Sequence, residues 1–117
     1  MSKRADRRID FHPPVCAVIK TVDRVYNALL TDISSSGLRF QSREHFKKGE
    51  KIIFEPKNDE HIDLPASIKA IVKNEYGKTE HDHYVYGAKI PRLSHWYERN
   101  RIHTFIYSEI KRREKDQ

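Results

Sequence analysis

The sequence has little cysteine and no long apolar run. Cys16 is the one cysteine among 117 residues, so no disulfide can form within the chain. No apolar stretch reaches the length of a signal-peptide core or a membrane span. Both absences favour a cytoplasmic protein without membrane insertion. Cys16 lies between Val15 and Ala17 in a strand-like run, which favours a small buried apolar residue over a nucleophile.

Catalytic signatures are also missing. The sequence contains no Ser/His/Asp arrangement, P-loop or dinucleotide fingerprint, so we predict neither an enzyme nor a catalytic cofactor. His81 and His83 would share one face of a strand. A short cluster without a distant matching pair rarely fills a four-ligand metal site, and we therefore predict none.

Charge and size are the informative bulk properties. A chain of this length fits one domain and can fold without a metal or a disulfide. Hydrophobic residues make up 37% and charged residues 34%, with aromatic side chains spread along the chain, which argues against wholesale disorder. Lys and Arg number 23 against 17 Asp and Glu, giving a net charge of +6. This excess favours anionic partners such as phosphates or nucleic acid.

The first twelve residues differ in composition from the rest. They are polar and basic, with Lys3, Arg4, Arg7 and Arg8 close together. Pro13 and Pro14 exclude a helix and mark the expected entry to the folded part. We therefore predict a flexible basic arm over residues 1–12 and one folded domain over residues 13–117.

Hydrophobic alternation of period two predicts strands along residues 13–91. The alternating segments are residues 15–20, 26–31, 38–41, 51–55, 62–73 and 83–90. Short spacing between them favours a small antiparallel β-barrel over βαβ units. The predicted fold class is mainly β.

A helical period follows, over residues 94–114. Ser94 is a plausible N-cap, and Ile102, Phe105, Ile106 and Ile110 would form one apolar face against the barrel. The last turns carry Lys111, Arg112, Arg113 and Lys115. These cations suit the negative end of the helix dipole, and we expect a solvated charged face there.

Arg4 and Arg8, four residues apart, carry the chemistry of the arm. A guanidinium can clamp a phosphate, stack on a base, and donate to O6 and N7 of guanine. Taken alone, such a segment is better explained as a solvated tail or a nonspecific nucleic-acid arm.

A second polar segment, residues 32–37, falls between two predicted strands. Asp32 can accept hydrogen bonds from a guanine edge, and the Ser34 hydroxyl can donate or accept. Gly37 permits a positive φ and close approach of a ligand to the backbone. Taken alone, this segment is better explained as an ordinary hairpin turn.

Together, in this order, the two segments resemble the signature of the PilZ domain family. Arg4 to Arg8 matches RxxxR, and Asp32 to Gly37 matches [D/N]xSxxG. Ile9 after the second arginine, Leu38 and Phe40 after the glycine, and the segment 86–90 are also similar to the family.

The resemblance implies a six-stranded, Greek-key-like antiparallel barrel that binds cyclic di-GMP. Arg4 and Arg8 would contact guanine Hoogsteen edges and phosphates, and the barrel side of the guanine site would be lined by Asp32, Ser34 and Gly37. Further candidates are Lys3, Arg7 and Ser36. Relatives often have arginine where this chain has Lys3, which leaves open whether one or two dinucleotides bind.

We therefore predict a bacterial, noncatalytic cyclic di-GMP receptor. Its arm would fold across the ligand, and the changed surface would signal to a downstream protein. One alternative is a small barrel that binds single-stranded nucleic acid nonspecifically. Another is a PilZ-like module that only mediates protein contacts, which the intact motifs disfavour.

Overall fold

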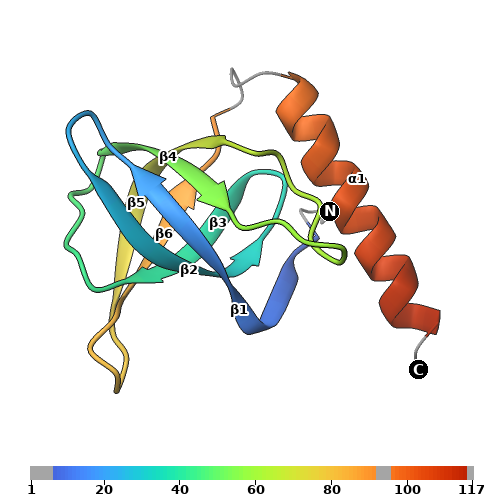
Figure 1. Cartoon of the computed structure of the whole chain (residues 1–117), viewed down its shortest axis with the longest axis horizontal. Coiled ribbons are helices and arrows are strands. Elements are labelled where there is room, and N and C mark those ends of the chain that lie inside the picture. The colour runs from blue at the N-terminus through green and yellow to red at the C-terminus, as the bar shows by residue number, and fades with distance from the viewer. Residues whose placement is uncertain (1–6, 92–95, 116–117) are drawn as a thin grey trace, which may run out of the picture.

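Six antiparallel strands close into a ring in the computed structural model, which describes residues 7–91 and 96–115 (Figure 1). The elements are β1 (Ile9–Lys20), β2 (Val25–Ile33), β3 (Gly37–Ser42), β4 (Lys51–Pro56), β5 (Ile68–Lys78), β6 (Tyr84–Lys89) and α1 (Trp96–Lys115). The order around the ring is β1-β2-β3-β6-β5-β4. The predicted antiparallel barrel with a C-terminal helix is confirmed. Lys3, Arg4 and Ser94 lie outside the described residues.

Aromatic rings fill the centre of the barrel. Phe40 packs against Tyr86 and Phe54, with ring centroids 5.4 and 5.7 Å apart. The Tyr86 hydroxyl accepts a hydrogen bond from the backbone N–H of Phe46 at 3.0 Å. Burial raises the pKa of this phenol, so the group stays neutral and its hydrogen bond persists in the core. The inward positions of the period-two pattern thus form a packed interior.

Strand β1 begins at Ile9, earlier than the boundary predicted at residue 13. Ile9 and Phe11 are buried, so this part of the basic segment already belongs to the core. Pro13 and Pro14 lie within β1, where the register with β2 is interrupted between Asp10 and Val15. Because the ladder is broken there, the missing proline N–H groups remove no regular ladder bond.

The strand predicted over residues 62–73 begins only at Ile68. The preceding loop is held by the Asn58 side chain, which accepts from the Leu64 N–H at 3.0 Å and donates to the Leu64 carbonyl at 2.7 Å. Leu64 is fully buried, whereas Ala66, expected to share the inward face, is exposed. The apolar residues before Ile68 therefore anchor a loop rather than a strand.

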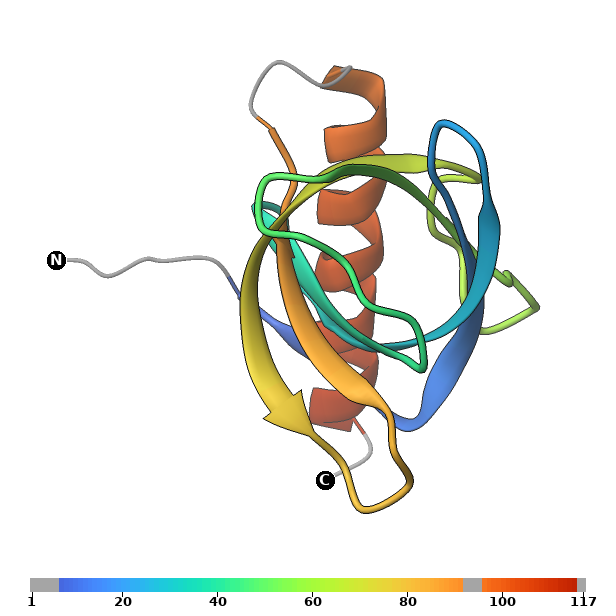
Figure 2. The same cartoon turned by 90° about the vertical axis from the view of Figure 1, so that its left-hand side faces the viewer.

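Helix α1 lies across one end of the ring of strands, behind the barrel in Figure 2. Its buried residues Ile102 and Ile106 join the barrel core, and Phe105 contacts Phe11 with ring centroids 6.1 Å apart. Within residues 7–91 and 96–115, no helix combines the length and hydrophobicity needed to cross a bilayer.

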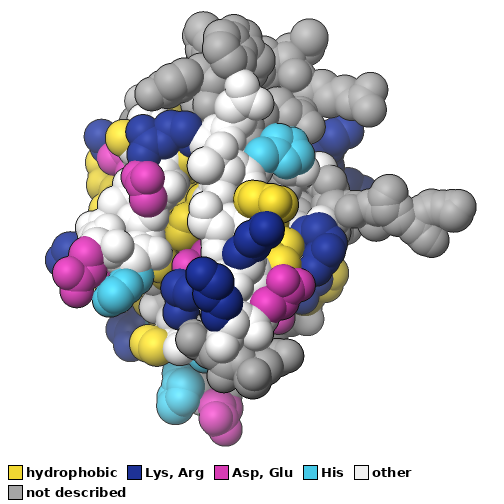
Figure 3. Space-filling view, turned by 90° about the vertical axis from the view of Figure 1, so that its right-hand side faces the viewer, with side chains coloured by type: hydrophobic (Ala, Val, Ile, Leu, Met, Phe, Trp, Pro, Cys, Tyr) yellow, Lys and Arg dark blue, Asp and Glu magenta, His cyan; other side chains and the backbone are white. Residues whose placement is uncertain are grey.

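The basic end of α1 is more than a solvated face. Lys and Arg side chains gather over its C-terminal turns (Figure 3). Arg112 Nη2 lies 2.7 Å and Arg113 Nε 3.5 Å from Oε2 of the buried Glu109. Arg113 also donates to the backbone carbonyl of Asp10 at 2.8 Å. Arg112 and Arg113, two of the four cations, therefore form ion pairs within the helix, and Arg113 also bonds to β1.

Candidate functional site

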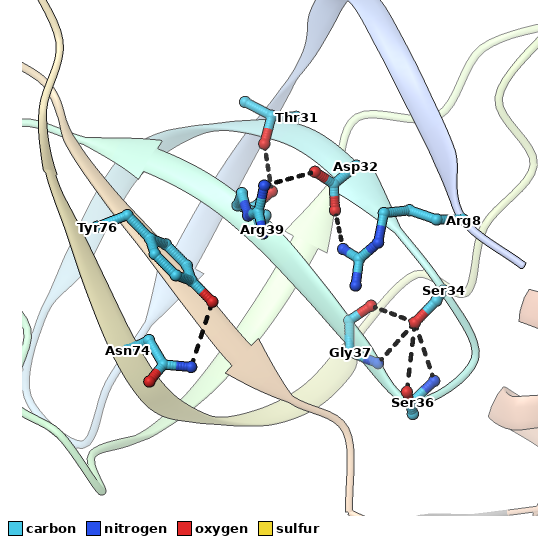
Figure 4. A network of polar contacts seen from close by, with 9 residues as sticks. All are labelled: Arg8, Thr31, Asp32, Ser34, Ser36, Gly37, Arg39, Asn74 and Tyr76. Carbon is cyan, nitrogen blue, oxygen red and sulfur yellow. Dashed lines mark hydrogen bonds and ion pairs between the residues drawn. The ribbon is translucent and has the colours of Figure 1, made fainter. Parts of the chain in front are cut away.

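The pairing of β1 with β2 places Arg8 beside the segment 32–37, as Figure 4 shows. Ile9 pairs with Ile33, and Asp10 pairs with Asp32, so the residue just before β1 lies beside the end of β2. Arg8 Nη1 donates to Oδ1 of Asp32 in an ion pair. The Asp32 side chain is 7% exposed and that of Arg8 47% exposed, so a buried carboxylate holds an accessible guanidinium. Parts of the two sequence motifs therefore meet.

The turn between β2 and β3 is built around the Ser34 side chain. Its hydroxyl oxygen accepts from the N–H groups of Ser36 at 3.3 Å and Gly37 at 3.2 Å. The Ser34 N–H donates to the Gly37 carbonyl at 2.8 Å, and the Ile90 N–H donates to the Ser36 carbonyl at 2.8 Å. Ser34 is 1% exposed, so its hydroxyl shapes the turn from inside, while the Ser36 side chain is exposed at the surface.

Gly37 makes a close backbone contact. Its φ is outside the left-handed region, so the positive φ that a glycine permits is not used here. A Cβ at this position would lie 2.8 Å from the backbone carbonyl oxygen of Ala88. Gly37 therefore allows β3 to approach β6 closely at the start of the pairing between these strands.

Arg39 forms the next part of the site. Its Nη1 lies 3.8 Å from Oδ2 of Asp32, so the two carboxylate oxygens face two different arginines. The guanidinium carbon also lies 4.7 Å from the centroid of the Tyr76 ring, in cation–π geometry. Asn74 Nδ2 donates to the Tyr76 hydroxyl at 3.2 Å. Arg39, Tyr76 and Asn74 make a flat, partly aromatic surface next to Arg8.

Strand irregularities position this surface. The β2–β3 register shifts between Leu30 and Asp32, and the β5–β6 register shifts on both sides of the Asn74–Glu75 pair. Such bulges re-aim side chains at binding sites. Gly87 lies beneath the Tyr76 ring, since a Cβ there would come within 3.0 Å of the ring. The tyrosine can therefore lie flat over β6.

These groups surround an open pocket of about 200 Å³. It is lined by Arg8, Ser36, Gly37, Leu38, Arg39, Lys73, Asn74, Tyr76, Gly87, Ala88 and Lys89. Four of these side chains carry positive charge, whereas Asp32 behind them carries one negative charge. We call this hollow the Arg8 pocket. Its charge and its flat aromatic wall suit an anionic ligand with a planar ring.

The predicted site residues do not all meet in this pocket. Arg8, Asp32, Ser34, Ser36 and Gly37 are brought together. The neighbouring residue Arg7 instead lines a separate hollow with Ser35 and α1. Lys3 and Arg4 lie outside the residues that the structure describes.

Sequence reasoning missed the far wall of the pocket. Arg39, Asn74 and Tyr76 come from two strands, and their positions depend on bulges and on the β3–β6–β5 order. The available signal was weak: Arg39 is the outward residue between Leu38 and Phe40, and Asn74 and Tyr76 lie in the exposed second half of β5.

A larger hollow, of about 560 Å³, lies along β1, β2 and β3. Its lining includes Cys16, which is exposed, so the expectation of a buried cysteine is wrong. The alternation explains this orientation, because Ala17 and Ile19 point inward and Cys16 therefore points outward. This hollow lacks the paired arginines and the turn, and the smaller Arg8 pocket is the better candidate site.

Comparisons with known proteins identify the fold independently. The PilZ domain family model matches residues 2–108. A PilZ domain of Escherichia coli YcgR, solved with c-di-GMP, shares 19% identity at a TM-score of 0.67, and the match covers 98% of both chains. No curated protein matches the chain.

Two longer proteins are also similar in structure. The MrkH–c-di-GMP complex of K. pneumonia shares 15% identity at a TM-score of 0.76, and the match covers 100% of this chain and 57% of MrkH. The motility inhibitor MotI/DgrA of Bacillus subtilis shares 14% identity at a TM-score of 0.67, with 97% of this chain and 54% of MotI covered. This chain therefore spans little more than half of either protein. Since the family model matches nearly its whole length, the chain belongs to the PilZ domain family.

Proposed function

We propose that this chain is a noncatalytic receptor that binds cyclic di-GMP in the Arg8 pocket. The observation that carries the proposal is the arrangement of Arg8 and Arg39 on either side of the Asp32 carboxylate, beside the turn. Family membership and the c-di-GMP-bound structures of MrkH and YcgR support the same ligand.

Arg8 would make the charged contacts with the ligand. Asp32 uses part of its guanidinium, and the half-exposed remainder has N–H groups that face outward. These donors suit O6 and N7 of guanine, or a phosphate oxygen. Asp32 would therefore position the arginine, and its buried carboxylate would keep that geometry when the ligand leaves.

The far wall would receive a guanine ring. Tyr76 is 54% exposed, and with the Arg39 guanidinium it offers a planar surface for stacking. Gly37 would let the ligand approach the start of β3, and Ser34 would keep the turn in shape. Ser36, Lys73 and Lys89 would add donors around the phosphates.

The pocket is smaller than most sites that enclose a small ligand. Binding sites that bury most of a small molecule usually enclose about 300–1,000 Å³, whereas the Arg8 pocket measures about 200 Å³. We propose that the chain before Arg8 supplies the missing cover, with Arg4 on the dinucleotide and Lys3 and Arg7 assisting. Ligand binding would then change the surface offered to a partner protein.

Calorimetric titration with cyclic di-GMP tests the ligand, with GTP and a short RNA as controls. We expect saturable binding of cyclic di-GMP alone, and loss of binding in Arg8→Ala. Arg24→Ala is the matched control, because it removes an exposed arginine on the β1–β2 hairpin away from the pocket. Comparable binding of all three ligands, or equal loss in both variants, would refute the proposal and favour a general polyanion binder.

Hydrogen exchange tests the proposed cover. We expect residues 3–10 to gain protection when cyclic di-GMP is added, while exchange in the core strands changes little. Binding with unchanged protection of this segment would refute the closure and leave the ligand assignment intact.

A further inference from the structure

The outer surface of β1, β4, β5 and β6 combines the exposed Ile53 and the half-buried Ile71 with lysines in a regular pattern. Across one row of paired residues, Ile53 lies between Lys20 and Lys69. Across the next row, Ile71 lies between Lys51 and Lys89. Paired residues of neighbouring antiparallel strands lie on the same face, so each isoleucine is flanked by two lysines. We call these six residues the lysine–isoleucine face.

An apolar hollow lies within this face. It measures about 440 Å³ and is lined by Ile53 and Ile71, with Val22 of the β1–β2 hairpin at its rim. Ile53 is 37% exposed and Val22 is fully exposed. Large apolar side chains grouped at one exposed place mark contact surfaces more often than scattered ones do.

Three of the four lysines of this face retain unneutralised charge. Lys20 pairs with Glu55 at 3.2 Å. Within the described part of the chain, Lys51, Lys69 and Lys89 make no ion pair. Protecting a strand edge does not explain them, because the barrel is closed and has no edge here. The charges of Lys51 and Lys69, which line the hollow, are therefore available to a partner.

We propose that the lysine–isoleucine face docks an acidic segment of a partner protein that inserts an apolar side chain into the hollow. Charge complementarity selects carboxylates around an apolar anchor, the usual arrangement of a polar rim around a buried centre. The recess favours a protein segment, because a single apolar side chain of a peptide can enter it while flanking carboxylates reach the lysines.

The face also meets the Arg8 pocket. Lys89 pairs with Gly37 on one side and with Ile71 on the other, and it lines the pocket. The proposed docking rests on the proposed receptor function in one respect: a receptor that signals needs a partner protein to contact. Its test uses no dinucleotide, so its failure would leave the ligand assignment untouched.

Selection of random displayed peptides on the purified full chain, followed by affinity measurement, tests the proposal. We expect the enriched peptides to carry Asp or Glu around a large apolar residue. The double variant Lys51→Glu/Lys69→Glu should bind them at least about tenfold more weakly. Ile71→Glu should also weaken peptide binding. If Ile71→Glu fails to fold, the double lysine variant still tests the proposal, because both lysines are exposed. Tyr107→Glu, on exposed α1, is the control and should bind normally.

Three outcomes would overturn the proposal. The first is that the enriched peptides lack acidic residues. The second is that their affinity is equal for the wild type and the double variant. The third is co-sedimentation with vesicles of equal parts phosphatidylglycerol and phosphatidylethanolamine that is lost in the double variant, which would assign the face to a membrane surface instead.

Discussion

Two sides of the Arg8 pocket, the turn over residues 32–37 and the Arg8 side chain, are built in different ways. The turn over residues 32–37 is fixed from inside, because the buried Ser34 hydroxyl accepts two backbone N–H groups and Gly37 fits closely against β6. Arg8 stands just before β1, and its ion pair with the buried Asp32 holds its half-exposed side chain. One wall is part of the barrel core, and the other is a side chain on the surface.

This difference separates residues that shape the site from residues that would touch the ligand. The Ser34 hydroxyl is used within the turn, and Gly37 is packed closely against β6. Their substitution should therefore change folding first. Arg8 contributes little to packing and retains outward donors, so its substitution should change binding first. The PilZ sequence motif does not distinguish these two roles, whereas burial and hydrogen bonding do.

Gly37→Ala should produce the largest loss of stability. The new Cβ would meet the Ala88 carbonyl oxygen at 2.8 Å, and backbone on both sides must move. We expect the free energy of unfolding to fall by about 1–3 kcal/mol, measured by urea denaturation.

Gly87→Ala is the matched control for this effect. The three heavy atoms nearest to its Cβ would all belong to the side chain of Tyr76, which is 54% exposed and can move away. We expect a change of less than about 1 kcal/mol. Equal losses in the two variants would show that the close approach of β3 to β6 is not what requires Gly37.

Sequence periodicity predicted most of the barrel because inward and outward residues alternate in its strands. The same signal was present at Ile9 and Phe11, but the following prolines suggested a boundary instead. Their place in β1 depends on the interruption in pairing with β2, which is a property of two strands and not of one. Similarly, the apolar pattern predicts Leu64 within a strand. Its burial in a loop instead depends on hydrogen bonds with the Asn58 side chain, which the pattern does not reveal.

The chemistry of the site was predictable in part. The motifs identify Arg8 and Asp32, whose contact follows once β1 pairs with β2. Ser34 was expected to face a ligand, yet it is buried in the turn. Arg39 and Tyr76 were missed because the ring order and the β5 bulges place them together. No local pattern in the sequence specifies that contact.

Helix α1 supports β1 two residues from Arg8, because Arg113 donates to the Asp10 carbonyl, and lowering the pH should weaken that support. Hydrogen bonding from Arg112, together with the nearby positive charges of Arg112 and Arg113, lowers the pKa of Glu109 below its ordinary value of 4.5. The folded chain therefore keeps Glu109 ionised at pH values where the unfolded chain protonates it. This stabilisation is present above pH 4.5 and is lost as the pH falls through the lowered folded pKa.

Urea unfolding at several pH values between neutral and about pH 3 measures this effect. We expect Glu109→Gln to reduce the loss of stability on acidification, since it removes the titrating group. Glu60→Gln is the control, because that side chain is 85% exposed. Identical pH profiles for the wild type and Glu109→Gln would show that the Glu109 contacts do not hold α1, and with it the Asp10 carbonyl, in place.

Arg8→Ala should have the smallest effect on stability and yet the decisive effect on the site. The variant removes one half-exposed partner of Asp32, while Arg39 remains 3.8 Å from the same carboxylate. We therefore expect the free energy of unfolding to change by less than about 1 kcal/mol. The same variant should no longer bind cyclic di-GMP. A loss of stability as large as that of Gly37→Ala would make Arg8 a structural residue, and the contrast between the two walls would fail. Retained stability with lost binding would show that the barrel builds the pocket without Arg8 and that the ligand needs the arginine.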